Sequence, residues 1–198
     1  MQSIDGFILS GGQSRRMGRD KCELTLNGQT FVERLSDRMA PIASSIKVVG
    51  KLVGEPRLPQ VADIYPAWGA LGGVHAALAN CSSKWGLVVA CDFPFVTTDL
   101  FARMNDVSAD FDAVAPVQAD GVPQPLCTLY RVDPCLAQAE LLIKSGERKP
   151  VALLQSVRTR WIDFEELADL EGSESFFNNI NTPEDYARIT TGESDSHS

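Results

Sequence analysis

Histidine is almost absent from this sequence, which has only two in 198 residues. His197 lies in the C-terminal stretch GESDSHS, whose polar composition is typical of a disordered tail. His75 lies in the helix-like run GGVHAALA, where we expect it to pack rather than to catalyse. A Ser-His-Asp triad or a histidine-rich metal centre is therefore hard to build from this chain.

The sequence also lacks paired cysteines and long apolar runs. Its five cysteines are odd in number and include no C-x-x-C pair. This usage favours free thiols in a reducing compartment over a disulfide framework or a zinc site. No apolar run reaches the roughly 18 residues that a transmembrane helix needs. The N-terminal MQSIDGFILS has no basic segment and does not resemble a secretory signal. We therefore expect a cytoplasmic protein with no membrane partner.

Positive charge is scarce, because 18 Lys and Arg stand against 26 Asp and Glu, for a net charge of −8. A protein this acidic is a poor general binder of nucleic acid, so no nucleic-acid partner is expected. However, Arg15, Arg16, Arg19 and Lys21 fall within seven residues. Even scatter of the cations would place roughly 0.6 in such a window. We interpret this basic cluster as an anion site rather than as a solvated turn.

Apolar patterning predicts strands that alternate with helices. The expected strands are 4–9, 46–49, 61–64, 85–91, 112–117, 125–131 and 158–163. The expected helices are 30–43, 70–79, 97–104, 134–144 and 149–155, with one more starting near Thr182. This order predicts an α/β fold of the Rossmann-like three-layer α/β/α type with a mostly parallel sheet. We expect one domain over residues 1–190 and a disordered tail over 191–198.

The loop after the first expected strand, LSGGQSRRMGRDK, runs from Leu9 to Lys21. Ligands bind at the carboxyl ends of strands in such sheets, and glycine lets backbone N–H groups approach a phosphate closely. The loop matches neither the Walker A pattern nor the G-x-G-x-x-G dinucleotide fingerprint. A unit charge pair at 4 Å is worth about 4 kcal/mol at an effective dielectric near 20. The cations of this loop therefore favour a nucleoside triphosphate.

A carboxylate follows the most apolar strand, in the stretch VVACDFPFV. Asp92 stands directly after the end of this strand, on the same expected edge of the sheet as the glycine-rich loop. Mg²⁺ prefers oxygen ligands, often one or two carboxylates together with substrate phosphates and water. Asp92 is thus a candidate magnesium ligand, although a carboxylate at this place can also serve as a turn cap.

These motifs together resemble those of the molybdenum cofactor guanylyltransferases. The family signature L-[AS]-G-G-x-S-x-R-M-G-x-D-K matches residues 9–21, its C-D-x-P matches 91–94 and its N-x-N-T-P-E matches 179–184. The resemblance covers about residues 4–189 and implies a nucleotidyltransferase of the glycosyltransferase-A-like type. It implies transfer of GMP from GTP to the terminal phosphate of molybdopterin, with release of pyrophosphate.

The resemblance, together with the glycines and cations of the loop, implies roles for individual residues. The nucleotide-binding set is Leu9, Ser10, Gly11, Gly12, Lys21, Asp63 and Asp92. Lys21, Asp92 and Arg16 are the expected catalytic residues, and Asp92 is the expected Mg²⁺ ligand. Asn179 and Asn181 are candidates for binding the acceptor, although they serve equally well as turn residues before a helix. Other molybdenum cofactor biosynthesis proteins and molybdoenzyme chaperones are the implied protein partners.

Two alternatives stay open at this point. One is a related nucleotidyltransferase that uses CTP, or that acts on a sugar or alcohol phosphate. The other is an accessory protein that binds molybdopterin or nucleotide without catalysis. The pair of Lys21 and Asp92 argues against the second alternative, because a carrier needs no metal-bound leaving group.

Overall fold

The computed structural model describes residues 3–10, 22, 24–50, 57–180, 182 and 185–187. Its strands are β1 (Ile4–Leu9), β2 (Thr25–Leu26), β3 (Gln29–Thr30), β4 (Ser45–Val49), β5 (Gln60–Val61), β6 (Trp85–Ala90), β7 (Ala113–Pro116), β8 (Cys127–Arg131) and β9 (Thr159–Ile162). Its helices are α1 (Phe31–Met39), α2 (Gly69–Ala79), α3 (Thr98–Asp106), α4 (Val132–Lys144) and α5 (Pro150–Ser156), with short 3₁₀ turns η3 (Phe164–Glu166) and η4 (Ser173–Ser175).

Seven strands form one sheet in the order β5-β4-β1-β6-β8-β7-β9. Strand β1 runs parallel to β4 and β6, β4 runs parallel to β5, and β7 runs parallel to β9. Only β8 runs against its two neighbours, β6 and β7. The other six strands therefore end at one edge of the sheet, and β8 begins there.

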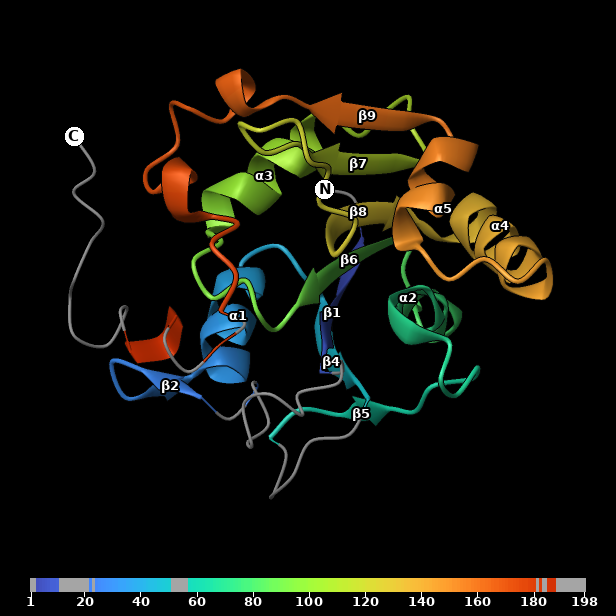
Figure 1. Ribbon diagram of the computed structural model, residues 1–198, viewed down its shortest axis with the longest axis horizontal. Coiled ribbons are helices and arrows are strands. Elements are labelled where there is room, and N and C mark those ends of the chain that lie inside the picture. Colours follow the sequence, from blue (N-terminus) through green and yellow to red (C-terminus); the bar gives the residue numbers. More distant parts are fainter. Residues whose placement is uncertain are drawn as a thin grey trace.

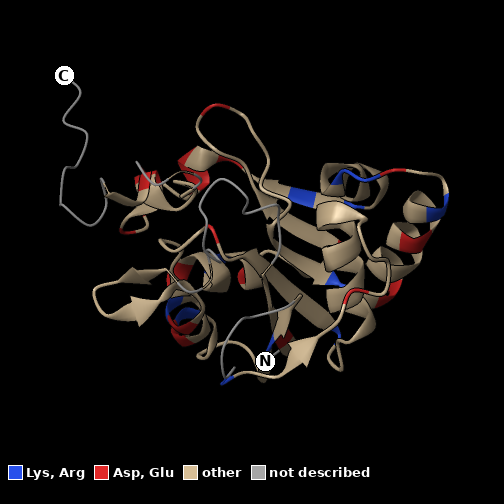
Figure 2. Ribbon diagram, turned by 60° about the horizontal axis from the view of Figure 1, so that its bottom comes forward, with Lys and Arg blue, Asp and Glu red and all other residues tan. Residues whose placement is uncertain are grey.

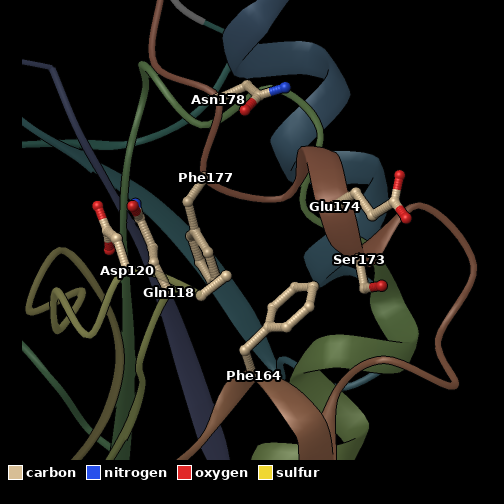
Figure 3. A pocket seen from close by; sticks show the side chains of 8 residues that line it. Gln118, Asp120, Phe164, Ser173, Glu174, Phe177 and Asn178 are labelled. Carbon is tan, nitrogen blue, oxygen red and sulfur yellow. The ribbon is translucent and has the colours of Figure 1, made fainter. Parts of the chain in front are cut away.

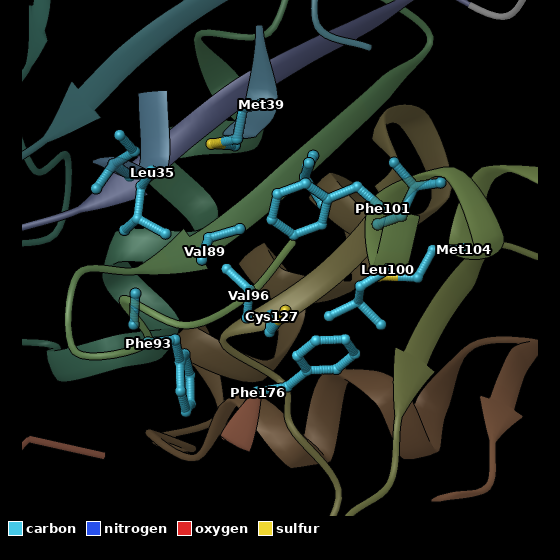
Figure 4. Packing of buried hydrophobic residues seen from close by; sticks show 14 of the residues in the cluster. Leu35, Met39, Val89, Phe93, Val96, Leu100, Phe101, Met104, Cys127 and Phe176 are labelled. Atoms are coloured by element: carbon cyan, nitrogen blue, oxygen red, sulfur yellow. The ribbon is translucent and has the colours of Figure 1, made fainter. Parts of the chain in front are cut away.

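Helices cover both faces of this sheet, with α1 and α3 on one side and α2, α4 and α5 on the other (Figure 1). The alternation of side chains along β1 divides the core accordingly. Ile4 and Ile8 belong to the buried cluster that includes side chains of α1 and α3, which Figure 4 shows in part. Phe7 and Leu9 belong to the cluster that includes α2, α4 and α5. The expected three-layer, mostly parallel α/β fold is confirmed.

Local signals in the sequence explain where α1 begins. Thr30 accepts a hydrogen bond from the backbone N–H of Glu33, and the Glu33 carboxylate accepts one from the Thr30 N–H. This reciprocal capping box satisfies two N–H groups that a helix start would otherwise leave without partners. The short β2–β3 hairpin before it turns at Asn27 and Gly28, which both have positive φ, as Asn-Gly turns commonly do.

Several expected boundaries need correction. The helix expected over 30–43 ends at Met39, two residues before Pro41. The strand expected over 61–64 is only the two-residue β5, because the chain turns away toward α2. Helix α4 begins at Val132 rather than at residue 134, and β6 ends at Ala90. The β2–β3 hairpin was not predicted as such. The expected tail, 191–198, lies outside the described residues.

The cysteines are free thiols, as the sequence predicts. None of the five, all of which belong to the described part of the chain, forms a disulfide. Burial raises the pKa of Cys81 to about 11 and that of Cys135 to about 12, so both remain protonated at neutral pH. None of the helices that the structure describes combines the length and apolarity required to cross a bilayer.

Candidate active site

Four strand ends meet at one edge of the sheet and form the candidate site. Leu9 at the end of β1 is in register with Val49 of β4 and with Ala90 of β6. Val49 is in turn in register with Val61 of β5. Neighbouring strands lie about 4.8 Å apart. The residues that directly follow these ends therefore line one narrow rim, although they are distant in the sequence.

Ser10 and Gly50 are in close backbone contact at the centre of this rim. The backbone N–H and the hydroxyl of Ser10 both donate to the carbonyl oxygen of Val49, at 2.9 Å and 3.0 Å. Gly50 has φ +100°, and a Cβ atom at this position would lie 2.1 Å from the backbone oxygen of Ser10. Only glycine fits such a conformation and such an approach. A side chain at position 50 would therefore displace Ser10 at the end of β1.

Asp92 occupies the turn after β6, beside the end of β1. The Cys91 N–H donates to the Leu9 carbonyl at 3.2 Å, which fixes the start of this turn against β1. The Arg34 side chain of α1 donates to the Pro94 carbonyl at 2.7 Å and fixes its end. Asp92 itself is half-buried. Its carboxylate is therefore carried by a turn that is held at both ends.

The C-terminal segment packs against the same turn. The N–H of Ile180 points to the carbonyl oxygen of Asp92 at 3.5 Å. The rings of Phe93 and Phe177 meet edge to face, with centroids 5.9 Å apart. Asn179 lies between Phe177 and Ile180 in the sequence and is exposed. The structure thus brings Asn179 to the Asp92 turn.

Asp63 lies in the exposed loop between β5 and α2, and a group of contacts fixes the far end of that loop. The indole N–H of Trp68 donates to the Glu147 carbonyl at 2.8 Å. The Arg148 guanidinium lies over the Trp68 ring, 4.7 Å from its centroid, and donates to the Ala67 carbonyl at 3.1 Å. We call Trp68, Glu147 and Arg148 the clamp. It ties the Asp63 loop to the connection between α4 and α5.

Metal binding at this rim would depend on few protein ligands. Among the described residues, no group of three or more His, Cys, Asp and Glu side chains could enclose a metal ion. A single carboxylate at a rim fits Mg²⁺ that takes its remaining ligands from substrate phosphates and water. The donor set around Asp92 is of this kind.

The residues expected at the site fall into two groups. The structure brings Leu9, Ser10, Asp63, Asp92 and Asn179 to the same edge of the sheet, on neighbouring strand ends and the segment packed on them. The others, which are Gly11, Gly12, Arg16, Lys21 and Asn181, lie outside the described residues.

The basic cluster of residues 15–21 lies outside the described residues. In Figure 2 the described Lys and Arg positions are coloured at separate places along the ribbon. Cys22, which follows Lys21 in the sequence, belongs to the same buried cluster as Cys91 and Phe93. This places the residue after the basic cluster in the core that also holds the residues on either side of Asp92.

His75 is buried in α2, as the sequence predicts. Its ring meets the Tyr65 ring edge to face, with centroids 4.9 Å apart. Burial lowers the pKa of His75, and the Glu140 carboxylate opposes this only in part. The imidazole is therefore neutral near pH 7 and serves in packing.

Sequence reasoning missed three residues of the site. It assigned no role to Gly50, whereas the structure requires glycine there. It assigned no role to Trp68 or Arg148, which form the clamp. The one available signal in the sequence was Trp68, which directly precedes the glycine-rich start of α2. This signal does not indicate which residues Trp68 contacts.

Comparison with known proteins places this chain in a family. Residues 6–160 match the family model of the MobA-like NTP transferase domain. A protein of Vibrio cholerae described as "Molybdenum cofactor guanylyltransferase" is 34% identical, over 92% of this chain and 89% of that protein. A protein of Yersinia pestis with the same description is 32% identical, over 92% of this chain and 93% of that protein.

Solved structures agree with this placement. The structure of molybdopterin-guanine dinucleotide biosynthesis protein A from Archaeoglobus fulgidus superposes with a TM-score of 0.79. The identity is 26%, over 94% of this chain and 97% of that one. A Thermus thermophilus 2-C-methyl-D-erythritol 4-phosphate cytidylyltransferase, at 16% identity, has a TM-score of 0.70, with 96% and 98% of the two chains covered. The second likeness shows the fold alone.

Proposed function

The chain belongs to the MobA-like NTP transferase family, and we propose that it is a molybdenum cofactor guanylyltransferase. It would transfer GMP from GTP to the terminal phosphate of molybdopterin. The observation that carries this proposal is the meeting of Ser10 and Asp92 on neighbouring strand ends. A nucleotide that reaches from one to the other lies across the rim, with its phosphates toward Asp92.

The reaction is an in-line displacement at the α-phosphorus of GTP. An oxygen of the acceptor phosphate forms the new P–O bond, while the bond between the α-phosphorus and its bridging oxygen breaks and pyrophosphate leaves. The attacking phosphate is already ionised near neutral pH, so no general base is required. This agrees with the buried, neutral state of His75. Catalysis then rests on positioning and charge stabilisation.

We assign Asp92 to hold Mg²⁺, which when bound neutralises phosphate charge and orients the phosphates. The rigid turn from Cys91 to Pro94 keeps the Asp92 carboxylate at the rim. We assign the backbone N–H groups of Gly11 and Gly12 to the triphosphate, and Lys21 and Arg16 to the leaving pyrophosphate. These four assignments rest on sequence.

The acceptor enters, in this proposal, on the side of the rim where Asn179 lies. Asn179 and Asn181 flank Ile180, whose N–H faces the Asp92 carbonyl. Their side-chain amides can donate to phosphate oxygens. We assign both residues to the phosphate end of molybdopterin, and Asp63 and Leu9 to the nucleoside of GTP.

The cellular setting follows from the same proposal. Buried thiols such as Cys127 and Cys135 suit a reducing compartment, so we place the protein in the cytoplasm. Its product would pass to other proteins of molybdenum cofactor biosynthesis or to molybdoenzyme chaperones.

The decisive assay compares the four nucleoside triphosphates. Purified protein is incubated with each of them, with molybdenum-loaded molybdopterin and with or without Mg²⁺, and pyrophosphate release and the mass of the product are measured. We expect the guanine dinucleotide from GTP, with Mg²⁺ required. Equal or faster turnover of CTP would instead identify a cytidylyltransferase. Binding of molybdopterin without pyrophosphate release from any triphosphate would identify a non-catalytic carrier.

A further inference from the structure

A cavity of about 440 Å³ opens at the same edge of the sheet as the candidate site. Its lining residues are Gln118, Ala119, Asp120, Phe164, Ser173, Glu174, Phe177 and Asn178. The first three follow the end of β7, and Phe164 follows the end of β9. Because β7 and β9 run in the direction of β1 and β6, this cavity shares the edge of the candidate site.

The lining of the cavity combines aromatic faces with hydrogen-bond acceptors. Figure 3 shows the Phe164 and Phe177 rings directed into it, with Gln118 and Asp120 standing beside Phe177. The Val122 N–H donates to the Asp120 carboxylate at 3.0 Å, which orients this exposed group. In pockets of this kind, the aromatic walls set the orientation of a planar ligand's ring, and the few polar groups form hydrogen bonds with one edge of that ring.

The charge of the lining excludes a phosphate. It contains two carboxylates, Asp120 and Glu174, and neither Lys nor Arg. Two described arginines on nearby segments are already paired, Arg103 with Asp169 at 2.8 Å and Arg160 with Glu166 at 2.5 Å. A dianion would be repelled here. A neutral planar heterocycle that has N–H donors along one edge fits instead.

Phe177 connects the cavity to the Asp92 turn. It lines the cavity, and its ring also packs against Phe93 with centroids 5.9 Å apart. Asn178, another lining residue, directly precedes Asn179 in the segment that contacts Asp92 through Ile180. A ligand whose ring lies in the cavity can therefore extend an attached phosphate toward Asp92.

We propose that this cavity binds the pterin ring system of the acceptor, and that other residues bind its phosphate. This inference rests on the proposed function and assigns the acceptor's two ends to different residues. Phe164 and Phe177 contact the faces of the ring. Asp120 accepts hydrogen bonds from the N3–H and the 2-amino group of the pyrimidine portion, and the Gln118 amide contacts the same edge. These residues would determine acceptor specificity.

The first test uses a pterin without a phosphate, 6-hydroxymethylpterin, whose fluorescence is followed during titration of the full-length protein. We expect saturable binding that Phe164→Leu and Asp120→Asn each weaken at least tenfold, which corresponds to about 1.4 kcal/mol. The asparagine can still accept the Val122 hydrogen bond, so the loop is kept. Glu171→Gln, an exposed carboxylate outside the lining, is the matched control and should bind as the wild type does. Equal binding by wild type, Phe164→Leu and Asp120→Asn would overturn the inference.

The second test separates this inference from the proposed function. Steady-state kinetics with GTP and molybdopterin should show a higher KM for molybdopterin in both cavity variants and an unchanged KM for GTP. If the wild type transfers GMP but the variants keep its acceptor KM, the cavity assignment is wrong and the proposed function stands. If the wild type makes no dinucleotide while the cavity variants still lose the pterin probe, the proposed function fails and the cavity assignment stands.

Discussion

At the scale of single residues, the candidate site depends on close contacts that chain composition does not reveal. Gly50 must be glycine because the Ser10 carbonyl lies where its Cβ would be. Asp5, within the strand that the sequence presents as almost wholly apolar, is buried at the other end of β1. Burial alone would raise the pKa of Asp5, but hydrogen bonds from Ser82 and Ser83 lower it on balance. Each environment arises from residues far away in the sequence.

Gly50→Ala tests the contact with Ser10. Both Gly50 and Gly28 have positive φ, but a Cβ at Gly28 would meet nothing within 4 Å. Gly28→Ala should therefore cost about 1 kcal/mol of backbone strain, whereas Gly50→Ala should cost about 1–3 kcal/mol more through the clash. Urea unfolding of the two variants measures the difference. Equal losses of stability would show that Ser10 does not restrict position 50.

Ser10→Ala tests the side chain at the same contact. The hydroxyl donates to the Val49 carbonyl, while the backbone N–H of residue 10 keeps its own bond to that oxygen. We expect a loss of about 0.5–1.5 kcal/mol in the free energy of unfolding. If the nucleotide contact assigned to Ser10 is made by its backbone, which Ser10→Ala keeps, kcat and the KM for GTP should stay nearly unchanged. A large rise in the KM for GTP would instead assign the hydroxyl to the nucleotide.

At the scale of elements, periodicity predicted most helices and strands, while short elements escaped it. The strands β1, β4 and β6 and the helix α2 lie within one residue of their expected bounds. The two-residue strands β2, β3 and β5 are too short for a period to show. The Asn27-Gly28 pair was a usable signal for the hairpin. The clamp could not be predicted, because it joins two loops that meet only after α2 packs against α4.

Arg148→Met tests whether the clamp positions the Asp63 loop. The variant removes the cation over Trp68 and the bond to Ala67, a loss of about 1–2 kcal/mol in local interactions. If Asp63 contacts GTP, the KM for GTP should rise severalfold while the KM for molybdopterin and kcat stay near the wild-type values. Trp68→Phe, which keeps an aromatic ring under Arg148 but loses the hydrogen bond to the Glu147 carbonyl, should raise the KM for GTP by a smaller factor.

The control for the clamp is Lys144→Met, which removes an exposed cation from α4 that pairs with Glu140. It should leave both KM values unchanged. A KM for GTP that is the same in Arg148→Met and Lys144→Met would limit the clamp to a structural role.

At the scale of the whole molecule, the alternation of elements predicted a layered α/β fold, but not the order of its strands. Strand β8 lies between β6 and β7 and pairs antiparallel with both, and this place in the order comes from pairing between distant segments. The short connection from β7 to β8, over residues 117–126, was a signal for antiparallel pairing, because parallel crossovers need a dozen or more residues. The convergence of strand ends on one rim followed from the layered fold, so the position of Asp92 at that rim could be predicted, whereas its role as a Mg²⁺ ligand stays a prediction.

Stability of the whole fold should depend on pH through His75. Burial lowers the pKa of His75 below its usual 6.5, so the unfolded chain binds this proton more readily than the folded protein does. The free energy of unfolding should therefore fall as pH drops through about 6.5. Urea unfolding at pH 8 and pH 5 should show a smaller difference in His75→Gln than in the wild type. An identical difference would contradict the assignment of a buried neutral imidazole.

The most direct measurement of the central claim is Mg²⁺-dependent pyrophosphate release from GTP by Asp92→Asn, with molybdopterin as acceptor. Asp99→Asn, which alters an exposed carboxylate in the first turn of α3, is the matched control. We predict that Asp92→Asn folds normally and loses about 100-fold or more in kcat, the order expected when one charge-stabilising group is removed, while Asp99→Asn keeps wild-type turnover. Wild-type turnover by a folded Asp92→Asn protein would contradict the account.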